Sequence, residues 1–222
     1  SSVEIETKQT YKIKKLKNKL HSKFFGMDII LPSDKINFTL DFKGVSGSVM
    51  KEFESFTTGQ LGLVDYLCFP IYQQGKLRFI EGRYKILNVK TQSPRYMRKP
   101  SNASTSDLLF PIDKITDKSH LILVEGLFDM LNLWQHGYKN TVCIFGTNNF
   151  RKEKASMIDN LGCTRVTIFM DNDISGNKAA ENITALLEAR DIETIIVQPP
   201  EGRDAGDLSK SELMKLFGEE YE

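Results

Sequence analysis

The second half of the chain alternates between short apolar runs and longer segments whose apolar residues recur at helical spacing. The apolar runs occupy residues 121–124, 141–145, 166–170 and 194–197. The helical pattern covers residues 127–134, 150–161, 175–187 and 210–217. Continuous apolar runs are typical of strands buried on both faces, and strand–helix alternation predicts a parallel sheet with right-handed crossovers. We therefore expect an α/β fold over residues 116–222, with a four-stranded, mostly parallel sheet flanked by helices.

The first part of the chain has a weaker helical pattern. Val49, Phe53 and Phe56 lie at helical spacing and predict a short helix over residues 47–56, capped by Ser46 or Ser48. Residues 1–60 are thus expected to form a basic arm followed by a small helical element.

Residues 61–115 are expected to form a small α+β subdomain that is rich in strands and basic. An apolar strand over residues 64–71, a turn with Gly75 at positive φ, and a return strand over residues 77–84 predict a β-hairpin. Residues 86–89 are expected to extend this sheet. Residues 91–106 contain Ser, Pro and basic side chains and are interpreted as a loop.

Charge is distributed unevenly, although the chain of 222 residues has a formal net charge of only +1. Residues 8–27 contain seven lysines and no acid, and residues 82–106 contain six Lys or Arg and no acid. This asymmetry indicates an anionic partner. Residues 1–27 are compatible with a short basic helix, with a solvated arm, or with an arm that contacts nucleic acid.

Cysteine spacing and hydropathy argue against a zinc ribbon and against a membrane-spanning helix. The three cysteines are far apart and form no CxxC pair, so we expect buried free thiols in a reducing compartment and no zinc ribbon. No apolar run approaches the roughly 18–20 residues of a membrane span, and no signal-peptide pattern occurs. The chain begins Ser-Ser, which suggests either a piece of a longer protein or a tag remnant.

Carboxylates follow the expected strands. Glu125 follows the first strand, Asp171 and Asp173 follow the third, and Asp204 and Asp207 follow the fourth. Clustered carboxylates repel one another unless a cation neutralises them. An all-oxygen set without His or Cys favours Mg²⁺ or Mn²⁺ over zinc. Such a site is the usual apparatus for phosphoryl transfer.

Several of these residues have alternative interpretations. Asp173 and Asp207 could instead cap the helices that follow them. Asp129 lies four residues after Glu125 and could be a ligand, a partner of a ligand or a surface charge. Gly146 follows the second strand, where a backbone without a side chain could approach a phosphate.

The order of these motifs resembles a known domain. Glu125-Gly126 followed by Asp129, then Asp171-x-Asp173, then Asp204 in a Gly-Arg-Asp turn, is similar to the Toprim domain of primases, topoisomerases, nucleases and recombination proteins. The upstream part narrows the choice. Three segments resemble the region before Toprim in DnaG-type primases and phage primase-helicases, namely residues 42–46, 69–83 and 94–100. The resemblance covers about residues 40 to 210.

The resemblance implies roles for individual residues. Glu125, Asp171 and Asp173 would be catalytic, and with Asp204 they would bind Mg²⁺ or Mn²⁺. Asp129 and Asp207 would be further acidic candidates. A second set would contact template or nucleotide: Arg83, Lys85, Arg95, Tyr96, Arg98, Lys99 and Gly146. Gly206 replaces the second acid of the bacterial Asp-Pro-Asp turn, which favours a phage or mobile-element type.

The implied function is that of a DNA primase RNA polymerase core. It would make short RNA primers from nucleoside triphosphates on a single-stranded DNA template by metal-dependent nucleotidyl transfer. A replicative helicase, in cis or in trans, and a zinc-binding domain absent from this chain would be its partners, in the cytoplasm of a bacterium or phage-infected cell. The alternatives are a Mg²⁺-dependent Toprim nuclease of the OLD type and a non-catalytic module that binds nucleic acid.

Overall fold

The computed structural model describes residues 29–86 and 93–218. The predicted N-terminal arm (residues 1–27) and residues 87–89 of the predicted sheet extension lie outside this part. The described residues from Leu31 onward belong to one compact unit. No helix among the described residues has the length and apolar character that crossing a membrane requires.

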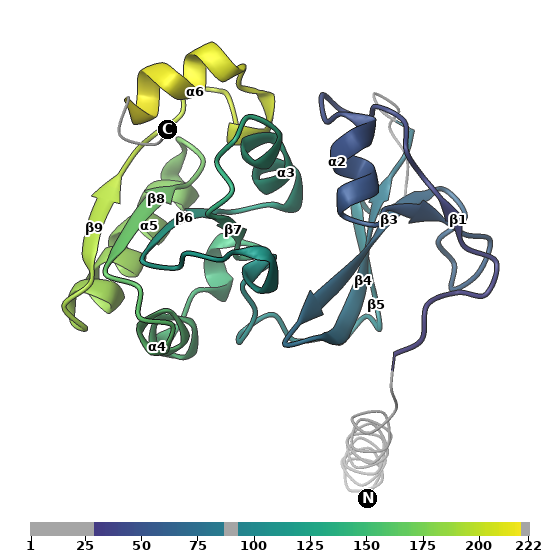
Figure 1. Cartoon of the computed structure of the whole chain (residues 1–222), viewed down its shortest axis with the longest axis horizontal. Helices are drawn as coiled ribbons and strands as arrows, with labels where there is room; N and C mark the ends of the chain where they lie inside the picture. Colours follow the sequence, from purple (N-terminus) through teal and green to yellow (C-terminus); the bar gives the residue numbers. More distant parts are fainter. Residues whose placement is uncertain (1–28, 87–92, 219–222) are drawn as a thin grey trace, which may run out of the picture. The chain divides into compact units, whose positions relative to one another are not determined.

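A four-stranded parallel sheet forms the second half of this unit (Figure 1). Its strands are β6 (His120–Val124), β7 (Thr141–Cys143), β8 (Arg165–Phe169) and β9 (Glu193–Ile196). Their order is β7-β6-β8-β9, and every neighbouring pair is parallel. The predicted α/β architecture is therefore confirmed.

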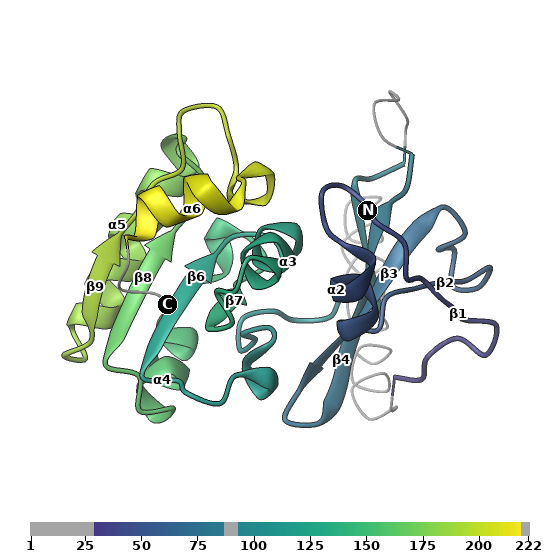
Figure 2. The ribbon, with the colours of Figure 1, turned by 45° about the horizontal axis from the view of Figure 1, so that its top comes forward.

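Helices cover both faces of this sheet (Figures 1 and 2). They are α3 (Leu127–Gln135), α4 (Lys152–Asn160), α5 (Ile174–Glu188) and α6 (Lys210–Phe217). Helices α3 and α6 lie over one face, and α4 and α5 lie over the other. Phe217 of α6 packs against Tyr138 and Phe169, with ring centroids 4.9 and 5.0 Å apart. Apolar side chains at helical spacing thus reach the sheet as predicted.

A five-stranded antiparallel sheet forms the first half of the unit. Its strands, in both chain and spatial order, are β1 (Ile36–Asn37), β2 (Phe56–Thr57), β3 (Tyr66–Gln73), β4 (Lys76–Tyr84) and β5 (Tyr96–Lys99). Gln74 and Gly75 join β3 to β4 with φ values of 53° and 68°. Two consecutive positive φ angles match the twist of a tight hairpin, so the predicted turn is confirmed.

Two predicted elements differ from the structure. Helix α2 (Gly47–Glu52) ends four residues before the predicted end, because Glu54 takes a φ of 53° and Phe56 enters β2 opposite Cys68. Ser46 is its N-cap residue but makes no side-chain cap, since the carboxylate of Asp41 accepts the N–H of Gly47 at 2.7 Å.

The second difference concerns the segment interpreted as a basic loop. Its residues Tyr96–Lys99 form strand β5, which pairs with β4 along Ile80–Arg83. The hydrogen-bonding edge of β4 outweighs the weak strand propensity of this basic stretch, because pairing depends on the neighbouring strand more than on composition. Three basic side chains predicted on a loop therefore lie on or beside a strand.

The two sheets share one hydrophobic core. Phe69 of β3 contacts Phe128 of α3, with ring centroids 5.8 Å apart, and Phe79 of β4 lies 5.3 Å from Phe145 after β7. Three short 3₁₀ helices complete the elements: η1 (Ile112–Lys114), η2 (Thr147–Asn149) and η3 (Ala205–Asp207). The antiparallel sheet is thus packed on the part of the parallel sheet where β7 ends. The division of the chain at residues 60 and 115 stays a prediction.

Candidate active site

The predicted carboxylates meet at the carboxyl edge of the parallel sheet. Glu125 directly follows β6, and Asp171 follows β8 by one residue. Burial raises the pKa of Glu125, and the charge of Asp171 raises it further. Burial likewise raises the pKa of Asp171, followed by the charges of Asp204 and Asp173. These mutual effects place the four acids close enough to repel one another.

Asp129 belongs to the same group. It lies on the first turn of α3, where its Oδ2 accepts the N–H of Gly126 at 2.9 Å. Burial, together with the charges of Asp204 and Asp171, raises its pKa to about 7. We call Glu125, Asp129, Asp171, Asp173 and Asp204 the carboxylate cluster.

Gly206 leaves room for this cluster. A Cβ atom at Gly206 would lie 2.9 Å from Oδ1 of Asp129 and 3.3 Å from Oδ1 of Asp204. A side chain there would therefore crowd two carboxylates. Steric crowding in this chain therefore favours glycine at position 206, where the bacterial Asp-Pro-Asp turn has its second acid.

Asp173 caps helix α5. Its Oδ1 accepts the N–H of Gly176 at 2.7 Å, which is the capping interaction foreseen as an alternative. Gly176 itself abuts the chain before the helix, because a Cβ there would lie 2.0 Å from the carbonyl oxygen of Asp171. The role of Asp173 as a metal ligand stays a prediction.

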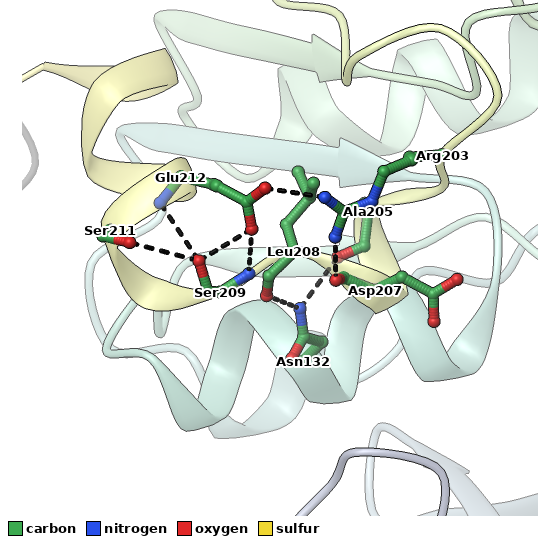
Figure 3. A network of polar contacts seen from close by, with 8 residues as sticks. All are labelled: Asn132, Arg203, Ala205, Asp207, Leu208, Ser209, Ser211 and Glu212. Carbon is green, nitrogen blue, oxygen red and sulfur yellow. Dashed lines mark hydrogen bonds and ion pairs between the residues drawn. The ribbon is translucent and has the colours of Figure 1, made fainter.

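Asp207 ends the η3 turn, and its backbone carbonyl oxygen accepts a hydrogen bond from Arg203 (Figure 3). Its side chain is 55% exposed and lies 3.6 Å from Nζ of Lys43. Helix α6 is capped instead by Ser209, whose hydroxyl and N–H pair with Glu212. The helix-capping interpretation of Asp207 is therefore wrong, and its role as an acidic ligand stays a prediction.

Asn132 holds the turn that carries Asp204 (Figure 3). Its side-chain N–H₂ donates to the carbonyl oxygens of Ala205 and Leu208, both at 2.8 Å. Arg203 braces the other side of the turn by donating to Glu212 at 2.6 Å. Sequence reasoning missed Asn132. An amide inside the apolar run of a buried helix was the available signal, since such a group needs partners.

The cluster has the chemistry of a divalent cation site. Oδ1 of Asp204 is buried and has no hydrogen-bond partner in the described protein, which an oxygen acceptor of a cation would explain. All five members offer only oxygen, the donor preferred by Mg²⁺ and Mn²⁺. Among the described residues, no three His, Cys, Asp or Glu side chains already form a compact metal-binding group. The donor set fits the predicted metal in chemical type, and metal binding stays a prediction.

Basic residues of the antiparallel sheet face the cluster. The guanidinium of Arg83 lies 4.9 Å from the ring centroid of Tyr96, and its Nε and Nη1 are buried without a hydrogen-bond partner in the described protein. Burial lowers the pKa of Arg83, and the charge of Asp204 acts in the opposite direction. Burial raises the pKa of Tyr96 to about 12. The positive charge of Arg95 lowers the pKa of Asp171 and so partly offsets the effects of burial and of the neighbouring acids.

The other predicted contacts to nucleic acid lie elsewhere. Arg98 donates to the carboxylate of Glu81 at 2.9 and 3.3 Å, and its guanidinium lies 4.4 Å from the ring centroid of Phe79. Lys85 donates to the carbonyl of Val64 at 3.1 Å. Their roles in binding a strand stay predictions.

Lys99 and Gly146 are the two remaining residues of the predicted contacts to nucleic acid or nucleotide. Lys99 lies near Gly62, where an added Cβ would be 3.9 Å from its Nζ. Gly146 has a φ of 107° and donates its N–H to the carbonyl of Glu125 at 3.1 Å. Gly146 therefore fixes the backbone beside the cluster, and its contact with a phosphate stays a prediction.

Lys154 was not foreseen as a special residue. It is fully buried on α4 and donates to the carbonyl oxygen of Ile144 at 2.6 Å, just before the turn at Gly146. Burial lowers its pKa to about 8. Its hydrogen bond supports the backbone at the end of β7, although burying the charged ammonium group is unfavourable.

We expect Lys154 to make stability depend on pH. Its pKa is about 8 in the folded chain against 10.5 for the free side chain, so the unfolded chain binds more protons between these values. The contribution of Lys154 to the free energy of unfolding should therefore rise with pH through this window, by up to roughly 3 kcal/mol. The buried cysteine thiols, whose pKa values are raised by burial, contribute in the opposite direction, so the contribution of Lys154 is read from a comparison of variants. Urea unfolding of the parent chain and of two variants from pH 7 to 10.5 measures this contribution. Lys154→Met should lose it, whereas Lys152→Met on the exposed side of α4 should keep the pH dependence of the parent chain; an equal pH dependence in both variants would contradict the assignment.

Comparisons with known proteins agree with this architecture. A Toprim-like family model matches residues 122–209. The DNA primase of Aquifex aeolicus is 31% identical over 138 residues, which are 60% of this chain and 26% of that protein. The DNA primase DnaG of Nanoarchaeum equitans is 34% identical over 108 residues, covering 48% of this chain and 27% of that protein. The chain thus spans about a quarter of these relatives.

Solved structures share the fold. The Aquifex aeolicus primase, solved with its zinc-binding and RNA polymerase domains, aligns with a TM-score of 0.64 at 22% identity, over 78% of this chain and 52% of that one. A DnaG primase catalytic domain bound to single-stranded DNA also has a TM-score of 0.64, at 17% identity, over 78% of this chain and 69% of that one. The sequence matches, the parallel sheet and the motifs at its edge show that residues 122–209 form a Toprim-like domain, and that the chain is similar in fold and sequence to the catalytic core of DnaG-type primases.

Proposed function

We propose that this chain synthesises RNA primers on single-stranded DNA, as a nucleotidyl-transferring RNA polymerase core. One observation carries the proposal. Arg83 and Asp204 each have buried polar atoms without a partner in the described protein, and the charge of Asp204 raises the pKa of Arg83 against the effect of burial. An unpaired guanidinium suits a phosphate, and an unpaired carboxylate oxygen suits a cation. A nucleotide phosphate with its counter-cation would satisfy both groups.

Glu125, Asp171, Asp173 and Asp204 would hold Mg²⁺ or Mn²⁺. The ion would offset the negative charge of the nucleoside triphosphate and of the departing pyrophosphate. Glu125, whose pKa is raised by burial, is suited to accept the proton of the attacking 3′-hydroxyl as its oxygen bonds to the α-phosphorus. The bond from that phosphorus to pyrophosphate then breaks.

Arg83, Arg95 and Tyr96 would orient the nucleic acid. The two guanidinium groups contact phosphates, and the Tyr96 ring, at 36% residue exposure, offers a face on which a base can stack. The primase relatives and the solved DnaG domain with single-stranded DNA support this assignment. A helicase and a zinc-binding domain are proposed as partners, in the cytoplasm of a bacterium or infected cell.

We expect short RNA when the chain is incubated with single-stranded DNA, labelled nucleoside triphosphates and Mg²⁺. Gel electrophoresis of the products checks this, and chelation of the cation should abolish the product. Templates of varied sequence, with a primase zinc-binding domain supplied in trans, are needed because template recognition can reside outside this chain. Cleavage of DNA without nucleoside triphosphates, together with no RNA on any template, would contradict primer synthesis and favour the nuclease.

A further inference from the structure

A groove between η2, the start of α4 and helix α5 begins at the rim of the carboxylate cluster. The hydroxyls of Thr147 and Ser175 meet there at 3.2 Å. The backbone of Thr147 hydrogen-bonds to Glu125, which lowers the pKa of that acid against the effect of burial. Ser175 follows Asp173 by two residues. The groove is therefore continuous with the candidate active site, yet it uses none of its acids.

The groove is strongly cationic. Arg151, Lys152 and Lys178 line it, and all three are exposed. None of them takes part in the ion pairs found among residues 29–86 and 93–218. The acids Glu153 and Glu181 belong to the same helices but do not line the groove. Three cations without a carboxylate partner attract a polyanion.

The walls also suit the rest of a nucleotide. Leu186 supplies partly exposed apolar surface beside the buried Phe150 and Ala179, and the exposed Asn182 supplies an amide. Along α5 the lining extends from Ser175 to Leu186, which is about 16 Å at 1.5 Å per residue. The cationic side chains at one end of the groove would contact phosphates, and the apolar surface beyond them would contact sugars or bases. A single strand leaves its sugars and bases accessible for such contacts. A duplex presents mainly its backbone, and one triphosphate is shorter than this groove.

We propose that this groove binds the phosphate backbone of a single nucleic-acid strand that extends from the carboxylate cluster. The strand is RNA or DNA, since both carry the same phosphodiester backbone. This surface is distinct from Arg83, Arg95 and Tyr96, which lie on the antiparallel sheet. Binding to it needs neither nucleoside triphosphates nor turnover, so it can be tested whether or not the chain makes primers.

The test is the affinity of the full chain for a fluorescent 12-nucleotide single strand, measured by anisotropy at several salt concentrations. We expect Arg151→Glu with Lys178→Glu to weaken binding about tenfold or more. The slope of log affinity against log salt should become shallower by about 1.4, because each phosphate contact on a single strand contributes about 0.7. RNA and DNA probes of one sequence show which strand binds more tightly.

Lys210→Glu with Lys215→Glu is the matched control, because it makes the same charge change on α6. Both double variants should keep the melting temperature of the parent chain to within a few degrees. Equal losses of affinity and slope in the two double variants would overturn the proposal. It would also be overturned if inorganic triphosphate, at the same phosphate concentration, displaced the strand from the parent chain as well as an unlabelled strand does.

Discussion

Asp171→Asn should lower primer synthesis by about a thousandfold. Asp171 is half-buried among Asp204, Asp173 and Glu125, and it has the raised pKa of a carboxylate held against like charges. Loss of its charge removes several kcal/mol of stabilisation from a bound cation and the phosphates it neutralises, which corresponds to a factor of this size. Product formation with saturating nucleotide measures the rate, and calorimetry with Mn²⁺ measures the loss of metal affinity.

The same substitution should raise the melting temperature when no divalent cation is present. The asparagine removes repulsion within the cluster, so lower activity would accompany equal or higher stability. Asp191→Asn is the matched control, because Asp191 is exposed after α5 and its φ of 57° is tolerated by asparagine. Normal primer synthesis by Asp171→Asn would exclude this carboxylate from catalysis, and a fall in its melting temperature would contradict the repulsion.

Gly176→Ala should damage both the fold and the site. The added Cβ would lie 2.0 Å from the carbonyl oxygen of Asp171, which is backbone and must shift. We expect a loss of about 2–4 kcal/mol in the free energy of unfolding, as for severe overpacking. The shift moves Asp171 itself and breaks the cap that Asp173 makes to Gly176. Metal affinity should therefore fall together with stability, as measured by urea unfolding and calorimetry.

Gly47→Ala separates these two effects. Its added Cβ would also lie 2.0 Å from a carbonyl oxygen, that of Thr39, at the start of α2 and away from the cluster. We expect a comparable loss of stability with unchanged Mn²⁺ affinity in the folded protein. If Gly47→Ala weakened metal binding as much as Gly176→Ala, the loss would come from general destabilisation and not from the position of Asp171.

The α/β half could be predicted because its signals are local. Each apolar run became a strand, and each carboxylate after a run lies at the carboxyl edge, since parallel strands end on the same side. The end of α2 and strand β5 could not be read in this way. Glu54 takes a positive φ that glutamate does not favour, and the Tyr96–Lys99 strand depends on the edge of β4.

Side-chain direction limited what could be predicted about the site. The spacing of Asp204 and Asp207 did not reveal that Asp207 faces Lys43, because a short 3₁₀ turn separates their directions. The same turn brings Gly206 against Asp129, which decides that this acid on α3 joins the cluster. Asn132 and Lys154 were missed because their partners are backbone carbonyls, which no residue pattern displays.

Helix α3 connects four parts of the molecule through one short stretch. Phe128 reaches β3, Asp129 reaches the cluster, Asn132 reaches the Ala205 turn, and Trp134 reaches α2 through the carboxylate of Glu52. A helix turns by about 100° per residue, so a single insertion or deletion between Gly126 and Trp134 would rotate some of these side chains away from their partners while leaving others in place. The length of this segment is therefore fixed as strictly as its composition, and variation in chain length among related proteins should fall outside it.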